Sequence, residues 1–234
     1  MSNAFRFKQF VIRQEQTPMK VGTDGVLLGA WATVEKAGHI LDIGTGTGLL
    51  ALMATQRNPK AWIDAIEVDE NACLQAALNI SASPWKERIQ LFSVSVFHFH
   101  PSKKYDSILC NPPFFIRSTP PPDSGRTLAR HCENFDHTAL ALTVKNWLSQ
   151  QGRFSLVLPV REAEHLINPC RENGLYLSRL TRVLPNPGKP PKRYLMEFSL
   201  NPATTVTDEL VVELSRHLYS ETYRSLTRDF YLNF

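Results

Sequence analysis

A glycine-rich turn, Asp42-Ile43-Gly44-Thr45-Gly46-Thr47-Gly48, is the feature that most constrains how this chain can fold. It ends the apolar run His39–Ile43 and precedes a helical pattern that begins at Leu49. Such a strand–turn–helix unit brings backbone close to a ligand and directs helix N–H groups at an anionic group. The third glycine comes one position too early for the dinucleotide-binding pattern. The turn therefore predicts an α/β ligand site other than an NAD site, and a turn that only packs strand against helix is the alternative.

Short β-rich runs alternate with helical patterns through the middle of the chain, which is typical of βαβ units. The pattern predicts an α/β fold with helices on both faces of a seven-stranded, mainly parallel sheet, closed by an antiparallel pair. The expected strands are His39–Ile43, Trp62–Val68, Ile89–Val96, Tyr105–Cys110, Gly152–Leu158, Leu175–Leu184 and Tyr194–Leu200. The expected helices are Leu49–Thr55, Glu70–Ile80, Phe135–Leu148 and Glu162–Glu172.

The 234 residues fit a single domain with additions at both ends of a core over 36–200. Residues 1–35 are expected to form an extension over the ligand site, with strand alternation at Phe5–Gln14 and a short helix at Asp24–Ala32. Residues 201–234 are expected to form a C-terminal helix, because apolar residues recur there with a helical period.

Composition limits the class of protein. Hydrophobic residues make up 43% and charged residues 21% of the chain, which is ordinary for a globular protein. No run approaches the roughly 18 apolar residues of a membrane-spanning helix, and the N-terminus lacks the apolar run of a signal peptide. Four widely spaced cysteines without a CxxC pair favour reduced thiols in the cytoplasm and no metal site. A net charge of +4 permits a nucleic-acid partner without requiring one.

Acidic residues close the second expected strand, in Ile66-Glu67-Val68-Asp69. In doubly wound nucleotide sites, an acid at this place binds ribose hydroxyls. The choice of Glu67 for this role, with Val68 beside it at the same ligand, is implied by the family resemblance described next. The alternative, in which the acids only end a strand and cap the next helix, fits Asp69 better.

The glycine turn closely resembles the first motif of class I S-adenosylmethionine-dependent methyltransferases, which have a Rossmann-like fold. The resemblance implies that Asp42 lies near the amino group of the methionine moiety, with Gly44 and Gly46 beneath the cofactor. The third cofactor motif of such enzymes commonly carries an aspartate near the adenine ring. The strand pattern puts Ser95 at that position here, with Val96 as its apolar neighbour, so this chain departs from the family pattern.

A second motif, Asn111-Pro112-Pro113-Phe114, directly follows the apolar run Tyr105–Cys110. The side-chain oxygen of Asn111 and the backbone carbonyl of Pro112 can accept hydrogen bonds from the two N–H groups of a planar, conjugated amine. Those hydrogen bonds favour a pyramidal nitrogen whose lone pair points at a methyl donor, and proline restricts the backbone that carries the carbonyl. Phe114 offers a ring for stacking the target base, worth about 1–3 kcal/mol. The motif predicts N-methyl transfer driven by alignment and electrostatics, and a strand-ending turn is the alternative.

Three further segments resemble the bacterial tRNA (adenine-N6)-methyltransferase family that acts on the adenine next to the anticodon of valine tRNA. They are Lys20–Trp31, Ala129–His131 and Lys189–Arg193. The resemblance implies S-adenosylmethionine as cofactor and tRNA as partner, in the cytoplasm, and we expect a monomer. It also implies that Thr23 and Asp24 lie over the methionine end of the cofactor, and a helix N-cap is the alternative.

Basic residues in the other two segments indicate contacts with RNA phosphates. Arg130 and His131 lie in the expected loop over 117–133, which is rich in proline and poor in apolar residues. The remaining cations, separated by prolines in a stiff segment suited to a phosphate backbone, are Lys189, Lys192 and Arg193. A solvated basic turn is the alternative there. An anticodon-loop base is already unpaired, so turning it into a pocket costs less than extracting a base from a duplex.

Other functions share parts of this pattern. An rRNA guanine-N2 methyltransferase also commonly carries the NPPF tetrapeptide, and a protein glutamine-N5 methyltransferase usually carries NPPY, so Phe114 disfavours the latter. A non-catalytic RNA-binding protein with a retained cofactor fold is a rival of a different class. The intact residues at Asp42, Glu67 and Asn111 count against it.

Overall fold

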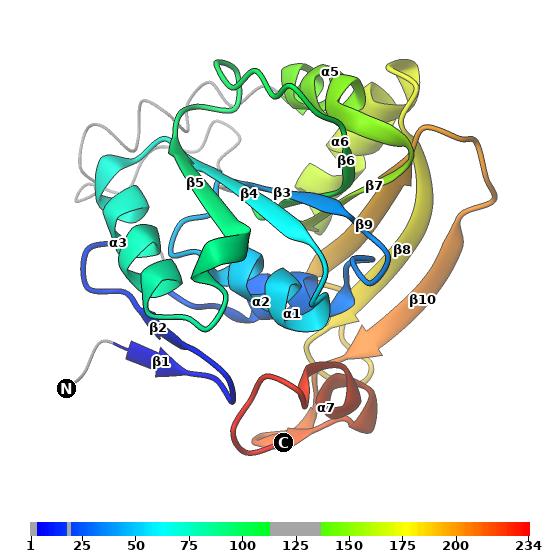
Figure 1. Ribbon diagram of the computed structural model, residues 1–234. Helices are drawn as coiled ribbons and strands as arrows, with labels where there is room; N and C mark the ends of the chain where they lie inside the picture. The colour runs from blue at the N-terminus through cyan, green and yellow to red at the C-terminus, as the bar shows by residue number, and fades with distance from the viewer. Residues whose placement is uncertain (1–3, 18–19, 113–136) are drawn as a thin grey trace, which may run out of the picture.

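The computed structural model describes residues 4–17, 20–112 and 137–234 (Figure 1). Its centre is an eight-stranded sheet in the order β10-β8-β9-β7-β6-β3-β4-β5. β9 runs antiparallel to both of its neighbours, and every other neighbouring pair is parallel. The strands are β3 (His39–Ile43), β4 (Trp62–Glu67), β5 (Ile89–Ser93), β6 (Tyr105–Cys110), β7 (Leu148–Pro159), β8 (Tyr176–Leu184), β9 (Arg193–Ser199) and β10 (Val206–Val211). The predicted α/β fold and antiparallel pair are confirmed, with eight strands where seven were expected.

Helices cover both faces of this sheet, as Figure 1 shows. One face carries α1 (Thr23–Trp31), α2 (Leu49–Arg57) and α3 (Glu70–Ser81), and the other carries α5 (His137–Trp147) and α6 (Val160–Glu172). A short 3-10 turn, η1 (Lys86–Arg88), precedes β5. The alternation along β3 divides its side chains between the two cores, since Ile40 joins the first core while Leu41 and Ile43 join the second. Asp42, on the same side as Ile40, therefore faces α2.

Local sequence explains where the helices beside the site begin. Asp69 is the N-cap of α3, and its Oδ1 accepts a hydrogen bond from the Ala72 backbone N–H at 2.8 Å, so the capping interpretation of Asp69 is confirmed. α2 follows Gly48, whose φ of 84° lies in the left-handed region that glycine tolerates.

The N-terminal segment forms a hairpin of β1 (Ala4–Arg6) and β2 (Val11–Arg13) in place of one longer strand. Asn79 of α3 fixes its end, because its side-chain amide donates to the carbonyls of Arg13 and Thr47, both at 2.9 Å. One buried side chain thus ties the N-terminal extension to the glycine turn.

The C-terminal segment corrects one prediction: a helix over 201–234 is wrong for most of its length. It contains β10, then β11 (Glu213–Ser215), β12 (Leu218–Tyr219) and α7 (Glu221–Thr227). β10 lies parallel to β8, from Val206 beside Arg179 to Val211 beside Leu184. The apolar residues have a helical period, but the segment pairs with β8 instead, so tertiary pairing overrides that local pattern.

The two ends of the chain pack together at the lower edge of Figure 1. Phe7 forms a β-bridge with Tyr231, and the Lys8 backbone N–H donates to the Phe230 carbonyl at 2.9 Å. The Lys8 ammonium donates to the Phe234 carbonyl, also at 2.9 Å. These contacts fasten the C-terminal strands and α7 to the N-terminal extension.

Candidate active site

A cavity of about 390 Å³ opens where β3 and β6 end. Ile43 pairs with Cys110 in the sheet, so the residues that follow, Gly44 and Asn111, leave neighbouring strands at the same edge. Chain order reverses between these two strands, and open α/β sheets bind ligands at such a point. Lining residues come from three segments: Lys20, Val21, Gly22, Thr23, Asp24 and Gly25; Gly44, Thr45, Gly46, Thr47, Leu49 and Leu50; and Asn111.

The glycine turn leaves room for a ligand. Gly44 and Gly46 have φ values of 67° and 58°, and a Cβ built on either residue meets no atom within 4 Å. Gly48 differs, since its Cβ would lie 3.8 Å from Ala76 of α3. The strand–helix packing alternative therefore fits Gly48, while Gly44 and Gly46 border the open cavity.

Asp42 lies fully buried behind this turn. Its Oδ2 accepts hydrogen bonds from the Thr45 hydroxyl at 2.5 Å and the Ala51 backbone N–H at 3.0 Å. Its Oδ1 is buried and accepts none from the described residues. Burial raises the pKa of Asp42 to about 7 and the charge of Glu67 adds to the increase, while the bonds from Thr45 and Ala51 oppose it. A cationic ligand group beside Oδ1 would satisfy both the orphaned acceptor and the buried charge.

Glu67 lies at the end of β4, 8% exposed, and braces the turn. Its Oε2 accepts from the Gly46 backbone N–H at 2.8 Å. Its Oε1 accepts from the N–H groups of Val68 and Asp69 at 2.8 and 3.0 Å. The acid is thus beside the cavity as expected, and its contact with a ribose stays a prediction. Val68 is 42% exposed next to it.

Asn111 supplies a second orphaned acceptor. Its Oδ1 is buried and accepts no hydrogen bond from the described residues, while the residue itself lines the cavity. Gly25 of α1 lies next to it: a Cβ there would be in ordinary contact with Asn111 Nδ2 at 3.6 Å, and its tight contact would be with Leu49 Cδ2 at 3.0 Å. Pro112 is buried directly after it. The other members of the predicted amine and RNA site in this segment, Phe114, Arg130 and His131, lie outside the described residues.

The first turn of α1 forms one wall of the cavity. Gly22 is the N-cap of this helix and no side chain caps it, which counts against the N-cap alternative for Thr23 and Asp24. Thr23 is exposed in the cavity wall. Asp24 Oδ2 accepts a hydrogen bond from Arg193 Nε at 2.7 Å, so the expected RNA contact Arg193 is paired with the expected cofactor contact Asp24.

Sequence reasoning missed what brings α1 to this position. A Cβ on Gly29 would lie 2.5 Å from Met53 Sδ and 3.1 Å from Met53 Cβ, so only glycine lets α1 pack this closely on α2. Gly25 and Gly29 are four residues apart and share one helix face. That spacing was the signal available in the sequence.

Ser95 and Val96 do not line the cavity. Ser95 Oγ lies 3.1 Å from His98 Nδ1, and its carbonyl accepts from the backbone N–H groups of His98 and Phe99. Val96 is 9% exposed and belongs to the second core. The structure gives both residues a local turn or packing role, and their contact with an adenine ring stays a prediction.

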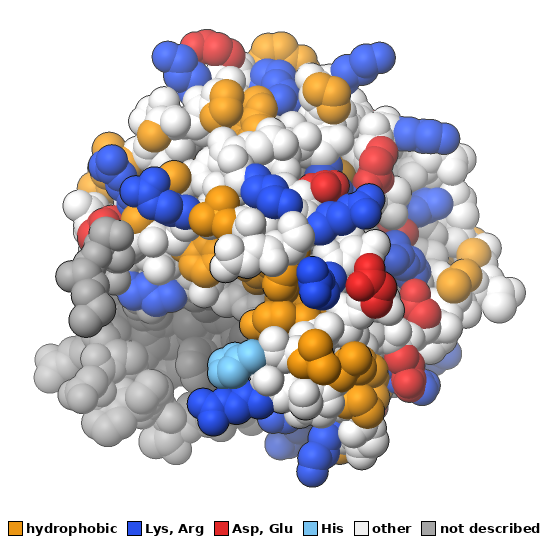
Figure 2. Space-filling view, turned by 90° about the horizontal axis from the view of Figure 1, so that it is seen from below, with side chains coloured by type: hydrophobic (Ala, Val, Ile, Leu, Met, Phe, Trp, Pro, Cys, Tyr) orange, Lys and Arg blue, Asp and Glu red, His pale blue; other side chains and the backbone are white. Residues whose placement is uncertain are grey.

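The basic segment before β9 reaches the surface. Lys189 and Lys192 are exposed, whereas Arg193 is partly buried against Asp24. Figure 2 views the molecule from below Figure 1 and shows Lys and Arg side chains spread across that face, with hydrophobic side chains between them. Asp and Glu side chains also lie on this face, so Lys189 and Lys192 are surrounded by a surface of mixed charge.

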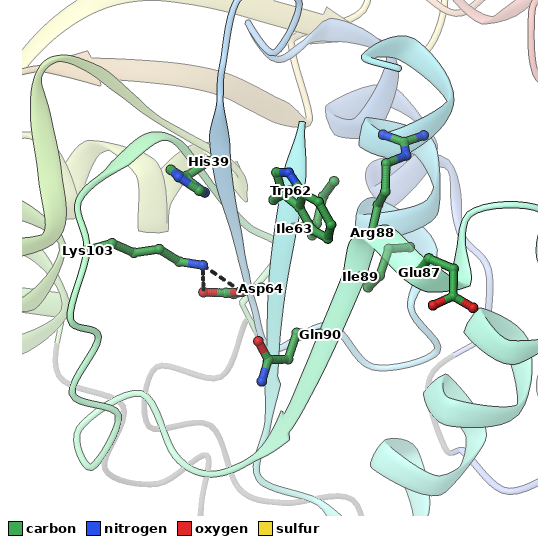
Figure 3. Close-up of a pocket in the computed structure, with 9 residues that line it drawn as sticks. All are labelled: His39, Trp62, Ile63, Asp64, Glu87, Arg88, Ile89, Gln90 and Lys103. Carbon is green, nitrogen blue, oxygen red and sulfur yellow. Dashed lines mark hydrogen bonds and ion pairs between the residues drawn. The ribbon is translucent and has the colours of Figure 1, made fainter. Parts of the chain in front are cut away.

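A second cavity, of about 410 Å³, lies where β3, β4 and β5 begin, at the opposite edge of the sheet (Figure 3). There Asp64 accepts from Lys103 Nζ at 2.9 Å and from the Tyr105 hydroxyl at 2.6 Å. Burial, with the adjacent Asp64, raises the pKa of Tyr105. These groups satisfy one another, and ligand sites of open α/β sheets lie at the other edge.

Neither metal nor membrane chemistry is evident in the described part of the chain. It contains no group of three or more His, Cys, Asp and Glu residues that could hold a metal ion. None of its helices is long and apolar enough to cross a membrane. The cysteines within it, Cys73, Cys110 and Cys170, form no disulfide.

Comparison with known proteins identifies the class. Residues 21–157 match the family model of the methyltransferase small domain. A predicted O-methyltransferase from Agrobacterium tumefaciens has a similar fold, with a TM-score of 0.71 at 17% identity over 88% of this chain and 96% of that one. A glycopeptide N-methyltransferase complexed with S-adenosyl-L-homocysteine gives a TM-score of 0.57 at 12% identity, over 76% of this chain and 91% of that one. The fold and the cavity at its strand ends are those of a Rossmann-like methyltransferase.

Sequence relatives narrow the class to a family. The tRNA1(Val) (adenine(37)-N6)-methyltransferase of Parabacteroides distasonis is 46% identical over 231 residues, which cover 97% of each chain. That of Bacteroides thetaiotaomicron is 44% identical over 98% of this chain and 97% of its own, and that of Vibrio cholerae 41% identical over 99% and 96%. The chain belongs to the tRNA1(Val) (adenine(37)-N6)-methyltransferase family.

Proposed function

We propose that this protein transfers a methyl group from S-adenosylmethionine to N6 of adenine 37, next to the anticodon, in tRNA1(Val). Its family membership supports the reaction and the substrate. The observation that carries the proposal in the structure is the position of Asn111, which lines the same cavity as the glycine turn and whose buried Oδ1 has no hydrogen-bond partner among the described residues.

The residues of the cavity fit the cofactor. Gly44 and Gly46 leave a cradle that any side chain would fill. Asp42 lies fully buried behind the lining residues, and its orphaned Oδ1 would accept from the ammonium group of the methionine moiety. When bound, S-adenosylmethionine supplies an electrophilic methyl group on a sulfonium. Glu67 holds the turn in shape through Gly46, and Thr23 and Asp24 cover the cavity from α1.

Asn111 and Pro112 prepare the nucleophile. The N6 amine of adenine is conjugated with its ring, so its lone pair is delocalised and weakly nucleophilic. Asn111 Oδ1 and the Pro112 carbonyl would accept hydrogen bonds from its two N–H groups and direct the lone pair into the cavity. Asn111 Oδ1 and the residue Pro112 are both buried, and such hydrogen bonds are stronger where competing water is excluded. The N6 proton leaves after transfer, and no side-chain base is needed to start the reaction.

The test uses the natural RNA pool. Purified protein is incubated with labelled S-adenosylmethionine and total tRNA from a strain that lacks the activity, and nucleosides are separated by mass spectrometry. N6-methyladenosine is the expected product. N2-methylguanosine in an rRNA reaction would favour the guanine enzyme, label in protein the glutamine enzyme, and RNA binding without label the non-catalytic alternative.

The proposed function has consequences for the cellular location and the oligomeric state of the protein. We propose a cytoplasmic location, because the proposed substrate is a tRNA and the described cysteines, which form no disulfide, fit a reducing compartment. We propose that it acts as a monomer with a single domain, whose core extends past residue 200 to include β10. Size-exclusion chromatography with light scattering tests the monomer against the mass of 26.5 kDa.

A further inference from the structure

The short hairpin of β11 and β12 lies next to the basic segment that precedes β9. Val212 donates to the Leu184 carbonyl at 2.9 Å, and Glu213 donates to the Pro185 carbonyl at 3.0 Å. The Asn186 side-chain amide donates to the Glu213 carbonyl at 3.3 Å. These bonds join the hairpin, residues 213–219, and the loop, residues 185–192, into one surface.

This joined surface is connected to the candidate active site. The loop continues directly into Arg193, which pairs with Asp24 in the cavity wall at 2.7 Å. An RNA whose target base enters the cavity would therefore lie against the loop first and the hairpin next.

The tip of the hairpin carries chemistry suited to RNA. Arg216 and His217 are exposed there, and Arg216 Nε donates to His217 Nε2 at 3.2 Å. Leu214 and Leu218 flank them at 52% and 53% exposure. Guanidinium groups bind phosphates in a bidentate manner, while exposed apolar side chains can cover ribose in the shallow minor groove of RNA.

The backbone at the tip is in an unusual conformation. His217 has a φ of 63°, a left-handed value that histidine adopts more often than most residues and that suits the tight, bulged turn between β11 and β12. Within the joined surface the charged residues are Lys189, Lys192 and Arg216 against the single acid Glu213, so its charge is positive.

We propose that the β11–β12 hairpin is a second RNA contact surface, which binds the phosphate backbone of the tRNA outside the target nucleotide. The proposal rests on the proposed function and extends it to a segment that sequence reasoning assigned to a helix. Arg216 and His217 supply the phosphate contacts, and Lys189 and Lys192 continue them toward the active site.

The test compares matched charge removals. The tip variant combines Arg216→Ala with His217→Gly, which removes both side chains and puts glycine at the left-handed position. The control, Lys86→Ala, removes one exposed cation from η1, next to β5 at the other end of the strand order from β10. We expect the tip variant to weaken binding of tRNA1(Val) about tenfold and to lower the slope of log K against log salt by about one. Arg216→Glu should weaken binding further. S-adenosylmethionine affinity and the unfolding temperature should stay as in the unmodified protein.

The outcomes separate the two proposals. Unchanged tRNA affinity in the tip variant, or an equal loss in Lys86→Ala, would overturn the hairpin assignment while leaving the enzyme active on tRNA. Failure of the unmodified protein to bind and methylate any tRNA would instead overturn the proposed function.

Discussion

Arg193 Nε donates a hydrogen bond to Asp24 Oδ2 at 2.7 Å, although 169 positions separate the two residues in the sequence. The pair joins the start of β9 to the first turn of α1, and both side chains are partly buried, at 31% and 23% exposure. The basic segment and the cofactor wall are thus one structural unit. Arg193 ties the two segments together, and we propose exposed Lys189 and Lys192 as the phosphate contacts of the basic segment.

Breaking this pair should loosen the cofactor wall. We expect Arg193→Ala and Asp24→Ala each to weaken S-adenosylmethionine binding about fivefold, and the double variant to weaken it no more than either single one, since one contact is lost in all three. Isothermal titration calorimetry measures the three affinities. Arg182→Ala is the matched control, because Arg182 forms an exposed pair with Glu209 at 3.8 Å on β8 and β10. Additive losses would show that Arg193 and Asp24 act independently.

Protonation of Asp42 should control cofactor affinity. Its pKa of about 7 means that the unliganded protein carries a neutral carboxyl below that pH, which cannot attract an ammonium group. Binding of S-adenosylmethionine should weaken as the pH falls below about 7, approaching tenfold per pH unit. Calorimetry between pH 5.5 and about 8.5 measures the profile. Asp42→Asn removes the titrating carboxyl, so its S-adenosylmethionine affinity should not show this pH dependence. A pH dependence as steep as that of the unmodified protein would show that another group causes it.

The same raised pKa affects stability. An acid whose folded-state pKa exceeds its unfolded value ionises first in the unfolded chain, so the unliganded fold loses stability as the pH rises from about 4 toward 8. Bound S-adenosylmethionine should offset this loss. The increase in unfolding temperature on adding the cofactor should therefore be larger at pH 8 than at pH 6, by calorimetric scanning. An increase that is the same at both values would contradict a charge pairing at Asp42.

Asn111 should matter for the reaction far more than for cofactor binding. We expect Asn111→Ala to lower the methylation rate about 100- to 1000-fold, the range found when one preorganised polar contact to a reacting group is lost. S-adenosylmethionine affinity should change less than about threefold. Asn111→Asp keeps an acceptor oxygen and should keep more activity than the alanine variant. Single-turnover rates decide the point, and equal rates in both variants would remove the acceptor role.

Gly29 should be intolerant of side chains. Its Cβ would overlap Met53, which is fully buried, so we expect Gly29→Val to lower the free energy of unfolding by about 2 kcal/mol. Shortening the opposing side chain in Gly29→Val with Met53→Ala should recover part of that loss. Urea denaturation measures both variants. No recovery in the double variant would place the strain outside the α1–α2 contact.

The sequence was informative where structure is local. Gly44 and Gly46 at a strand end, Asp69 before a helix and the run Tyr105–Cys110 each carry their own signal, and the core elements lie within a few residues of their predicted bounds. β10 was missed because its partner β8 is distant in the chain. The β-branched residues around Val206, in Thr204-Thr205-Val206-Thr207, were the available clue to a strand.

The residues of the candidate site likewise fall into those that the sequence could predict and those that it could not. Asp42, Glu67 and Asn111 follow strands that the pattern identifies, so parallel pairing brings them to one edge of the sheet. The role of Gly25 and Gly29 depends on how α1 approaches α2, which the local sequence does not specify. The pairing of Arg193 with Asp24 depends on a fold that joins two segments far apart in the chain. Ser95 fits the motif by position only, because the turn after β5 directs its hydroxyl to His98.

The most direct test of the central claim is to locate the methyl group on a defined RNA. An unmodified tRNA1(Val) transcript and its A37G counterpart are incubated with the protein and labelled S-adenosylmethionine, and the nuclease fragments are mapped by mass spectrometry. We expect one methyl group on N6 of adenine 37 in the first transcript, none in the second, and none in either with Asn111→Ala. Label at another nucleotide, or equal label in both transcripts, would contradict the account.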